Sequence, residues 1–487
     1  MAIDLYMVRV VLNSLGAVDY GIFDVVAGVV LMFQSVSSVL IISTQRFYSY
    51  ELGRKDESNL QGVFTSSVNI YLLLSLLIVL ICETVGVWFV NSQLTIPDDR
   101  LTAANWVFQF SIFSFVFTIL QVPYSAAVIA NEDMGIFSVI SILNCLLKLI
   151  CALFIASVAF DRLSYYGAYL LTISFVIYIL YLFVAHKRYK WCNYEFKKAH
   201  QHLEIIKFSG WTFLGTTANV GITQVCTILV NVFFNPVVNA ARAVSFQINS
   251  AISSFCGSFL MAIRPPMIKA YAEGNYSDLN KLFESSNKIV CYSLLLVCLP
   301  LFFEMDTVLF FWLKTNDPLT VLFARLIVVY AFILSLNSPI TFIIHATGRV
   351  KEYHVLVEIP TLLCAPITYL LFKIGCPAYS TYLTMIGAVI ISHVIRLLCL
   401  KRIYPLFNLG DYIKSFCGPA VLIALLCVIV CYPLHIVLRH DLIRIVIVTF
   451  VNAIVLVVLV FSFGINKHER GILAEEYKKR INKCRQN

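Results

Sequence analysis

The sequence predicts an all-α, polytopic membrane protein with about 14 transmembrane helices arranged as two pseudo-symmetric lobes. Three observations lead to this prediction: the composition, a series of long apolar segments, and a segment that occurs twice. The chain has 487 residues, of which 60% are hydrophobic and only 13% are charged, and its mean hydropathy is +0.85. A water-soluble protein of this length could not bury so much apolar surface, so the chain belongs in a membrane.

The apolar segments set the number of helices. A helix needs about 20 apolar residues to cross the hydrocarbon core of a bilayer. Residues 2–12 resemble the second half of a first helix, which predicts that this helix is truncated and brings the expected number to 14. The complete spans are expected near 20–44, 60–90, 102–130, 134–158, 164–185, 209–235, 238–263, 286–312, 319–345, 354–374, 378–400, 413–437 and 442–464.

The repeated segment predicts two homologous lobes. Ser58–Ile70 reads SNLQGVFTSSVNI and Ser277–Ile289 reads SDLNKLFESSNKI, at a spacing of 219 residues, with six of the thirteen positions identical. A related tetrad precedes each copy, YELG at 50–53 and YAEG at 271–274. Internally repeated membrane proteins are very often transporters.

The distribution of positive charge sets the orientation. If the loop after the first helix is placed outside, the inside segments hold most of the 36 Lys and Arg residues and the outside segments hold few. This alternation follows the positive-inside rule. It predicts that both termini are cytoplasmic if the first helix is complete.

The spans and the repeat together predict five regions. A basic linker separates the two lobes, and its cations would lie against anionic lipid. The regions are an N-terminal lobe at 1–185 (helices 1–6), a basic cytoplasmic linker at 186–208, a C-terminal lobe at 209–405 (helices 7–12), two additional helices at 406–466 and a basic cytoplasmic tail at 467–487.

Several function classes are disfavoured. The net charge of +9 is spread over short loops rather than gathered on one face, which argues against a nucleic-acid partner. The 15 cysteines lie mostly singly within apolar spans, where they act as small buried hydrophobes, and no metal site is expected. No P-loop, HExxH or GxSxG motif is present, and the outside loops are short, so a transporter is favoured over an enzyme.

Polar side chains form stripes on two predicted helices. Gln224 and Asn231 share one face of the seventh helix, and Arg242 and Asn249 share one face of the eighth. Such stripes point either to a hydrated cavity or to hydrogen bonds with a neighbouring helix.

Charged residues within the spans differ in their predicted depth. Lys148 lies midway along the fifth helix, one turn after Asn144, and is too deep to reach water easily. Its ammonium is therefore expected to face a hydrated cavity, an acidic partner or an anionic ligand. The charges nearer the outer ends can extend to the interface, and these are Arg9, Asp24, Glu83, Arg242 and Arg325. Prolines within the spans are expected to break or end helices, and these are Pro123, Pro265, Pro266, Pro339, Pro360 and Pro366.

Several stretches resemble a known family. LYMVRVVLNSLGAVDYGIFDVVAGVV followed by TQRFYSYELGRKD looks like the start of bacterial oligosaccharide flippases of the Wzx type. NAARAVSFQINSAISSFCGSF at 239–259, QVPYSAAVIANEDM at 121–134 and HATGR at 345–349 are similar to the same group, within the multidrug/oligosaccharidyl-lipid/polysaccharide exporter superfamily. Two features depart from the pattern: the chain starts partway through the first helix, and Asp24 stands where the family more often has asparagine.

The resemblance implies an architecture and a substrate. The architecture is two six-helix lobes around a central cavity, with two further helices at the C-terminus. The substrate is an undecaprenyl-diphosphate-linked sugar unit, moved from the inner to the outer leaflet of the bacterial plasma membrane for surface polysaccharide (O-antigen, capsule or exopolysaccharide) biosynthesis. Membrane lipids and other glycan assembly proteins are the further partners that it implies, and a two-lobed chain is expected to work as a monomer. No cofactor is expected beyond a coupling ion, H⁺ or Na⁺.

Candidate site residues follow from the stripes and the buried charges. We expect Lys148 and Arg242 to contact or steer the anionic head group, because cations neutralise a diphosphate. Secondary binding candidates are Arg9 and Arg46, and candidates for ion coupling are Asp24 and Glu83. The side chains expected to line the path of the sugar are Gln224, Asn231 and Asn249.

Three alternatives stay open at this point. A cation-coupled multidrug exporter of the same superfamily would have the same helices but would favour acidic residues deep in its cavity. A peptidoglycan-precursor flippase differs only in the head group that it moves. A membrane glycan polymerase or ligase is disfavoured by the short outside loops.

Overall fold

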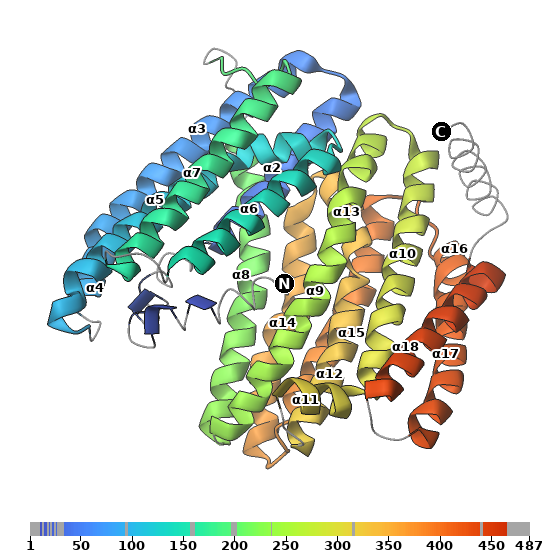
Figure 1. The fold of residues 1–487 in the computed structure, drawn as a ribbon. Helices are drawn as coiled ribbons and strands as arrows, with labels where there is room; N and C mark the ends of the chain where they lie inside the picture. Colours follow the sequence, from blue (N-terminus) through green and yellow to red (C-terminus); the bar gives the residue numbers. More distant parts are fainter. Residues whose placement is uncertain are drawn as a thin grey trace, which may run out of the picture. The chain divides into compact units, whose positions relative to one another are not determined.

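The computed structural model describes residues 34–92, 96–155, 161–195, 202–234, 236–313, 317–438 and 442–464, together with isolated positions between 10 and 26. Every regular element in this part of the chain is a helix (Figure 1). Eleven of these helices are long and apolar enough to cross a membrane. The all-α, polytopic prediction is therefore confirmed. Arg9, Asp24 and the basic tail at 467–487 lie outside the described residues.

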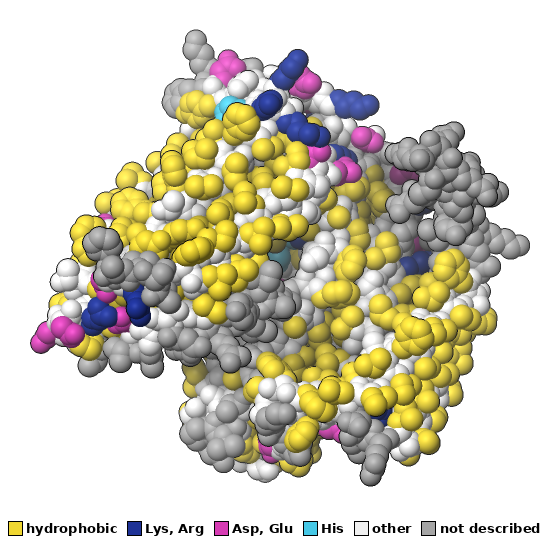
Figure 2. Space-filling view, in the orientation of Figure 1, with side chains coloured by type: hydrophobic (Ala, Val, Ile, Leu, Met, Phe, Trp, Pro, Cys, Tyr) yellow, Lys and Arg dark blue, Asp and Glu magenta, His cyan; other side chains and the backbone are white. Residues whose placement is uncertain are grey.

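The surface of the helices is largely apolar. Hydrophobic side chains cover the flanks of the helices, whereas Lys, Arg, Asp and Glu gather mainly near their ends (Figure 2). Leu73 is 68% exposed and Val446 is 66% exposed. A surface of this kind is stable in lipid and would aggregate in water.

The chain divides into two compact units. Unit 1 comprises Met1–Thr217 with Ile268–Gly274, and unit 2 comprises Ala218–Met267 with Asn275–Asn487. Two long helices, α8 (His202–Phe233) and α9 (Pro236–Ala272), contribute residues to both units. The boundaries predicted from the sequence for the two lobes and for the segment between them stay a prediction.

Unit 1 is built around α5. In Figure 1 this helix runs beside α3 and α7, and it also packs against α2. Its apolar core includes Phe108 and Ile112, whose side chains are fully buried. The helices are α2 (Gln34–Arg54), α3 (Glu57–Ile81), η1 (Cys82–Gly86), α4 (Val87–Ser92), η2 (Asp98–Arg100), α5 (Leu101–Ala130), α6 (Met134–Phe154) and α7 (Arg162–Arg188).

Unit 2 has its core among α8, α9, α12, α14 and α15, and α17 and α18 pack beside α10 (Figure 1). Phe323 and Tyr382 are fully buried there, and so are cysteines such as Cys226. The remaining helices are α10 (Tyr276–Phe303), α11 (Met305–Leu313), α12 (Pro318–Ser335), α13 (Ser338–Thr347), α14 (Val350–Lys373), α15 (Ser380–Ile403), α16 (Leu409–Tyr412), η5 (Ile413–Cys417), α17 (Gly418–Val437), α18 (Leu442–Leu459) and η6 (Val460–Gly464).

The repeated segment forms the same local structure twice. Before α3, Lys55 has φ 58° and the Asp56 side chain caps the helix by accepting a hydrogen bond from the backbone of Asn59. Before α10, Gly274 has φ 72° and the Asn275 side chain accepts from the backbone of Asp278. Each copy is thus a left-handed residue, an N-cap and a new helix, and the two left-handed residues stand 219 positions apart, as do the two caps.

The same spacing extends to the packing of these two helices. Leu60 and Phe64 on α3 are buried, and so are their counterparts Leu279 and Phe283 on α10. In each helix the two side chains are spaced i, i+4. They therefore lie on one face, which is the face that an amphipathic helix turns toward its neighbours.

Most of the prolines do not break helices, contrary to the prediction. Pro123 lies inside α5, Pro265 and Pro266 lie inside α9, and Pro360 and Pro366 lie inside α14. Membrane helices tolerate proline because neighbouring helices and side chains satisfy the freed carbonyl groups. Only Pro339 behaves as expected, since it stands at the start of α13.

Candidate functional site

Arg242 is enclosed within unit 2 near the start of α9. Its side chain is 1% exposed, so the expectation that it extends to the membrane interface is wrong. Its Nε donates to Thr227 Oγ1 on α8 at 3.1 Å, and the guanidinium lies 4.6 Å from the ring centroid of Phe246 and 5.5 Å from that of Tyr382. Such stacking stabilises a desolvated guanidinium. Arg242 has no carboxylate partner among the described residues.

The polar stripe on α8 adjoins this arginine. Thr227, which accepts the bond from Arg242, lies one turn from Gln224 and one turn from Asn231 on the same face. The side chains of Gln224 and Asn231 are exposed and have no hydrogen-bond partner in the described part of the chain. Asn249 lies two turns along α9 from Arg242, and its Oδ1 atom is buried without a partner among the described residues. Two of the three predicted amides thus lie one turn of α8 from the threonine that binds Arg242, and the third lies two turns along α9.

Lys148 lies in unit 1 on α6, as the sequence predicts. Its side chain is half-buried, and no described residue forms an ion pair or hydrogen bond with its ammonium. Asn144, one turn earlier, is half-buried as well. An uncompensated ammonium within a membrane helix is costly, and such groups usually face a hydrated space or a ligand.

Arg46 lies in the C-terminal half of α2 and is 9% exposed. Its guanidinium is stacked among aromatic rings, at 4.6 Å from the centroid of Phe47, 5.1 Å from that of Tyr50 and 5.3 Å from that of Phe208. Glu51, five residues further along α2, is also buried. This carboxylate was not among the predicted candidates, although it belongs to the tetrad YELG that precedes the repeat.

Glu83 lies in the π-helical turn η1 and is exposed. Gln109 on α5 donates to its Oε2 at 3.0 Å. This bond is a contact between two helices, and the role of Glu83 in ion coupling stays a prediction.

Unit 2 also contains a buried polar core. Arg396 on α15 is 9% exposed, and its Nε donates to the hydroxyl of Tyr353 on α14 at 2.9 Å. Glu358 lies on α14 and is 9% exposed as well. His393 on α15 bonds to Asn337 at 2.7 Å. Helical spacing indicates which faces these residues occupy, but it does not reveal that the faces meet.

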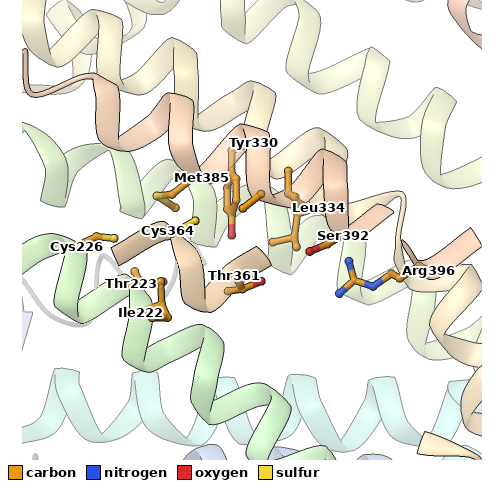
Figure 3. Close-up of a pocket in the computed structure, with 12 residues that line it drawn as sticks. Ile222, Thr223, Cys226, Tyr330, Leu334, Thr361, Cys364, Met385, Ser392 and Arg396 are labelled. Atoms are coloured by element: carbon orange, nitrogen blue, oxygen red, sulfur yellow. The ribbon is translucent and has the colours of Figure 1, made fainter. Parts of the chain in front are cut away.

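A small cavity adjoins this core among α8, α12, α14 and α15 (Figure 3). It offers about 20 Å³ to a water-sized molecule. The residues labelled in Figure 3 surround it, with Thr223 from α8, Tyr330 from α12, Thr361 from α14 and Arg396 from α15 among them.

A second buried charge network joins the additional helices α17 and α18 to α10 and α11. Glu304, at the junction of α10 and α11, is fully buried, and its Oε2 accepts from Arg444 Nε at 2.6 Å. Its other oxygen lies 3.0 Å from His435 Nδ1, and Arg444 also donates to Thr307 at 2.9 Å. This network explains why the predicted span 286–312 is divided between two helices at Glu304.

The helix ends of unit 1 are also tied by charge. Arg100 donates to Asp161 Oδ1 at 2.7 Å and forms a short ion pair with Asp19. Burial would raise the pKa of the Asp161 carboxyl, but hydrogen bonds from Ser164 and from Arg100, with the charge of Arg100, lower that pKa below its ordinary value.

Among the described residues, no group of three or more His, Cys, Asp or Glu side chains is arranged to hold a metal ion.

Solved structures of transporters share this fold. An outward-facing multidrug resistance MATE family transporter of the MOP superfamily aligns with a TM-score of 0.71 at 13% identity, over 84% of this chain and 94% of that chain. A MOP superfamily transporter from Pyrococcus furiosus aligns with a TM-score of 0.68 at 13% identity, over 83% and 92%. The Vibrio cholerae MATE transporter VcmN aligns with a TM-score of 0.64 at 15% identity, over 84% and 93%.

The sequence comparisons add nothing to this likeness, because no family model and no curated protein matches the chain. At these identities the structural likeness establishes the fold alone. The chain therefore has the helical fold of MATE transporters of the MOP superfamily.

Proposed function

We propose that this protein is a lipid-linked oligosaccharide flippase. It would move an undecaprenyl-diphosphate-linked sugar unit from the inner to the outer leaflet of the bacterial plasma membrane by alternating access, for surface polysaccharide biosynthesis. The proposal joins the fold, which it shares with transporters, to the Wzx-type resemblance of the sequence. It makes the chain a transporter and not an enzyme.

The observation that carries the proposal is a pair of uncompensated cations in the membrane-spanning helices. Lys148 in unit 1 and Arg242 in unit 2 have no carboxylate partner among the described residues. An unpaired positive charge inside a membrane protein is energetically costly, and an anionic ligand would compensate it. Arg242 is enclosed, so it would act on a diphosphate through its field or after a local rearrangement, whereas Lys148 is partly accessible.

The amides fit the rest of the head group. Gln224 and Asn231 present exposed donors and acceptors one turn on either side of Thr227, which binds Arg242, and sugar hydroxyl groups need both. A diphosphate cannot cross hydrocarbon unaided, because an unpaired charge loses its hydration there. Polar groups along a protected path would replace that hydration.

An apolar groove suits the lipid tail. It offers about 530 Å³ between α10, α12 and α17, and its walls include Leu299, Phe302, Val328, Phe332 and Tyr432. A hydrocarbon chain can lie in such a groove without losing its apolar surroundings, since the tail of the substrate has no need to leave the bilayer.

A structural neighbour offers a parallel in which the polarity of the binding pocket is linked to function. In the MOP superfamily transporter from Pyrococcus furiosus, a reverse polarity of the binding pocket suggests a different function for that protein. By analogy, the cations Lys148 and Arg242, which have no carboxylate partner among the described residues, favour an anionic substrate over a cationic drug.

A cation-coupled multidrug exporter is the second candidate. Several structural neighbours are MATE transporters, one of them a multidrug resistance protein, and unit 1 contains the carboxylates Glu51 and Glu83. A drug exporter would depend on these carboxylates and would not depend on Lys148.

Deletion of the gene tests the proposed function. The expected result is that finished, diphosphate-linked sugar units accumulate on the inner leaflet and that surface glycan is lost. The double variant Lys148→Gln, Arg242→Gln should fail to restore the glycan at normal expression, whereas Lys281→Gln, which removes an exposed cation from α10, should restore it. Restoration by the double variant, or loss of drug resistance without any change in glycan, would overturn the flippase proposal.

A further inference from the structure

In unit 1, the segment that follows α7 lies along the first turns of α3. The Gln61 side chain on α3 donates to the backbone carbonyl of Asn193 at 3.1 Å. The backbone N–H of Glu195 donates to Thr65 Oγ1, also on α3, at 3.3 Å. This face of α3 is therefore covered by the chain itself.

Unit 2 has a matching segment after α15. The backbone N–H groups of Tyr189 and Tyr404 donate to the last turns of α7 and α15, at 2.9 Å and 2.8 Å. Three residues further on, the N–H groups of Cys192 and Phe407 donate to the carbonyls of these tyrosines, at 3.0 Å in both units. The sequences YKWC and YPLF thus form the same turn twice, after the corresponding helix of each unit.

The two turns differ at their third position. Trp191 packs edge-on against Phe64 on α3, with 6.1 Å between the ring centroids. Leu406 stands at the corresponding position in unit 2 and is 57% exposed. Phe283 on α10, the counterpart of Phe64 in the repeat, stacks instead on Tyr412 at 5.8 Å.

A pocket lies at this place in unit 2. It offers about 90 Å³ to water-sized molecules, several times the space that one water needs. Its wall on α10 consists of Asn280, Phe283 and Glu284, the repeat counterparts of the covered side chains on α3. The turn and α16 supply the opposite wall, which includes Leu406 and Asp411. Unit 2 therefore has a pocket on the face that unit 1 covers with its own chain.

The lining of this pocket suits a cation. Glu284 is partly exposed and Asp411 is exposed, and neither forms an ion pair or a hydrogen bond with a described residue. The rings of Phe283 and Tyr412 line the same pocket. Carboxylates and the faces of aromatic rings both attract a cationic side chain.

The basic tail begins close to this pocket. α18 packs along α10 (Figure 1), and the turn η6 that follows it ends at Gly464, where a Cβ atom would lie 2.8 Å from the hydroxyl oxygen of Tyr292 on α10. Glu284 precedes Tyr292 by eight residues of α10, a distance of about 12 Å along a helix. Lys467 and Arg470 follow Gly464 by three and six residues. An extended chain spans up to about 3.6 Å per residue, so both cations can reach the pocket.

Charge and orientation favour the same occupant. Residues 465–487 contain seven Lys and Arg residues against three Glu residues. The positive-inside rule places this tail and the start of α10 on the cytoplasmic side. A tethered segment is also present at a high effective concentration, which a separate molecule must match by its abundance.

We propose that the basic tail docks in this pocket, with the cations Lys467 and Arg470 at the carboxylates Glu284 and Asp411. The tail then covers α10 in unit 2 as the segment after α7 covers α3 in unit 1. This contact is independent of the transported substrate.

Photo-cross-linking of the full-length protein in native membranes tests the contact. Benzoylphenylalanine in place of Leu406, on the wall of the pocket, should cross-link to a peptide from residues 465–487, identified by mass spectrometry. Leu398 on α15 is 56% exposed and does not line the pocket. The same photoreactive group in its place is the control and should leave the tail unmodified.

Charge reversal in the tail identifies the cations. The double variant Lys467→Glu, Arg470→Glu should lower the cross-linking yield roughly fivefold, because an exposed ion pair contributes up to about 1 kcal/mol. The double variant Lys483→Glu, Arg485→Glu makes the same change of charge near the end of the sequence and should keep the yield. Equal yields in these two variants would overturn the proposal.

Charge reversal in the pocket completes the exchange. Glu284→Lys with Asp411→Lys should lower the yield as the first tail variant does, and the two double variants combined should recover it, because opposite charges then face each other again. A combined variant without recovery would overturn the proposal. Cross-linking to a phospholipid or to another protein, with the tail unmodified, would overturn it as well, since the pocket would then hold a different occupant.

Discussion

At the scale of single residues, the buried charges distinguish this protein from an ordinary helical bundle. Arg242, Arg396 and Arg444 are each at least nine-tenths buried, and each is held by a different kind of partner. Arg444 is neutralised by Glu304, Arg396 donates to a tyrosine, and Arg242 relies on a threonine and two aromatic rings. A guanidinium can bind all three kinds of partner because it is planar, stacks on rings and donates from several nitrogens.

Replacing Arg242 by lysine tests this interpretation of its role. A lysine ammonium cannot both donate to Thr227 and stack on Phe246 and Tyr382. We expect Arg242→Lys to lower the free energy of unfolding by about 1–2 kcal/mol, the worth of a desolvated cation–π contact, measured by thermal unfolding of the purified protein in detergent.

Arg402→Lys is the matched control, because Arg402 is exposed on α15. It should change the unfolding temperature little, since substitutions at exposed sites are usually within about 0.5 kcal/mol of neutral. Equal stability of the two variants would contradict the assignment of Arg242 as a packed cation.

At the scale of elements, the end of α9 is held in unit 1 by close contact with α2. A Cβ atom at Gly53 would lie 2.6 Å from the carbonyl oxygen of Lys269 and 2.8 Å from Ala272 Cβ. Lys269 also forms an ion pair with Glu132 at 2.7 Å. The tetrads YELG and YAEG, which precede the two copies of the repeat, thus meet at a position where only glycine fits.

Gly53→Ala should therefore destabilise the protein, because its methyl group would displace backbone atoms rather than a flexible side chain. We expect a loss of about 1–3 kcal/mol, the usual cost of overpacking, in thermal unfolding. Gly135→Ala in α6 is the control, since a Cβ atom there meets nothing within 4 Å. That variant should be neutral or more stable by up to about 1 kcal/mol, and a similar loss in both variants would refute the close contact.

The ion pairs that join the starts of α5 and α7 predict a dependence on pH. The pKa of Asp161 is lowered from its ordinary value of 3.8 in the folded protein, so its ionised form contributes stability at pH values above about 4. That contribution should disappear as the pH falls through the lowered pKa, because the proton breaks the pairing with Arg100.

Thermal unfolding between neutral pH and pH 3 measures this effect. Asp161→Asn should lower the unfolding temperature at neutral pH, and the difference from the wild type should shrink in acid. A difference that stays constant over this range would show that the carboxylate charge is not the source of the stability.

At the scale of the whole molecule, the predicted orientation follows from loop charge and can be tested with the native cysteines. Most described cysteines are buried, whereas Cys376 is partly exposed in the loop between α14 and α15, which the positive-inside rule places outside. Cys484 belongs to the basic tail, which the same rule places in the cytoplasm.

A membrane-impermeant maleimide should therefore label Cys376 in intact spheroplasts, and Cys376→Ser should abolish this labelling. Cys484 should react only after the membrane is opened. Labelling of Cys484 in intact spheroplasts would show that every helix has the opposite orientation to the predicted one. The proposed direction of transport would then be wrong as well.

The sequence predicted the class of fold because apolar segments of sufficient length must become helices in lipid, where every backbone group needs an internal partner. It also predicted the repeat, whose turns and caps are local features set by residues such as Asp56 and Asn275. It did not predict that proline would lie inside α5, α9 and α14, because the tolerance of a membrane helix depends on its neighbours.

Only part of the candidate site could be predicted from the sequence, because the contacts between helices depend on how the helices pack. Helical spacing placed Gln224 and Asn231 on one face and identified Lys148 as a deep cation, but it contained no information on which face meets which. Only the tertiary structure brought Arg242 to Thr227, joined Arg396 to Tyr353, and joined Glu304 to Arg444 across 140 residues of chain. Periodicity is a property of one helix, whereas the partner of a buried charge is a property of the packing between helices.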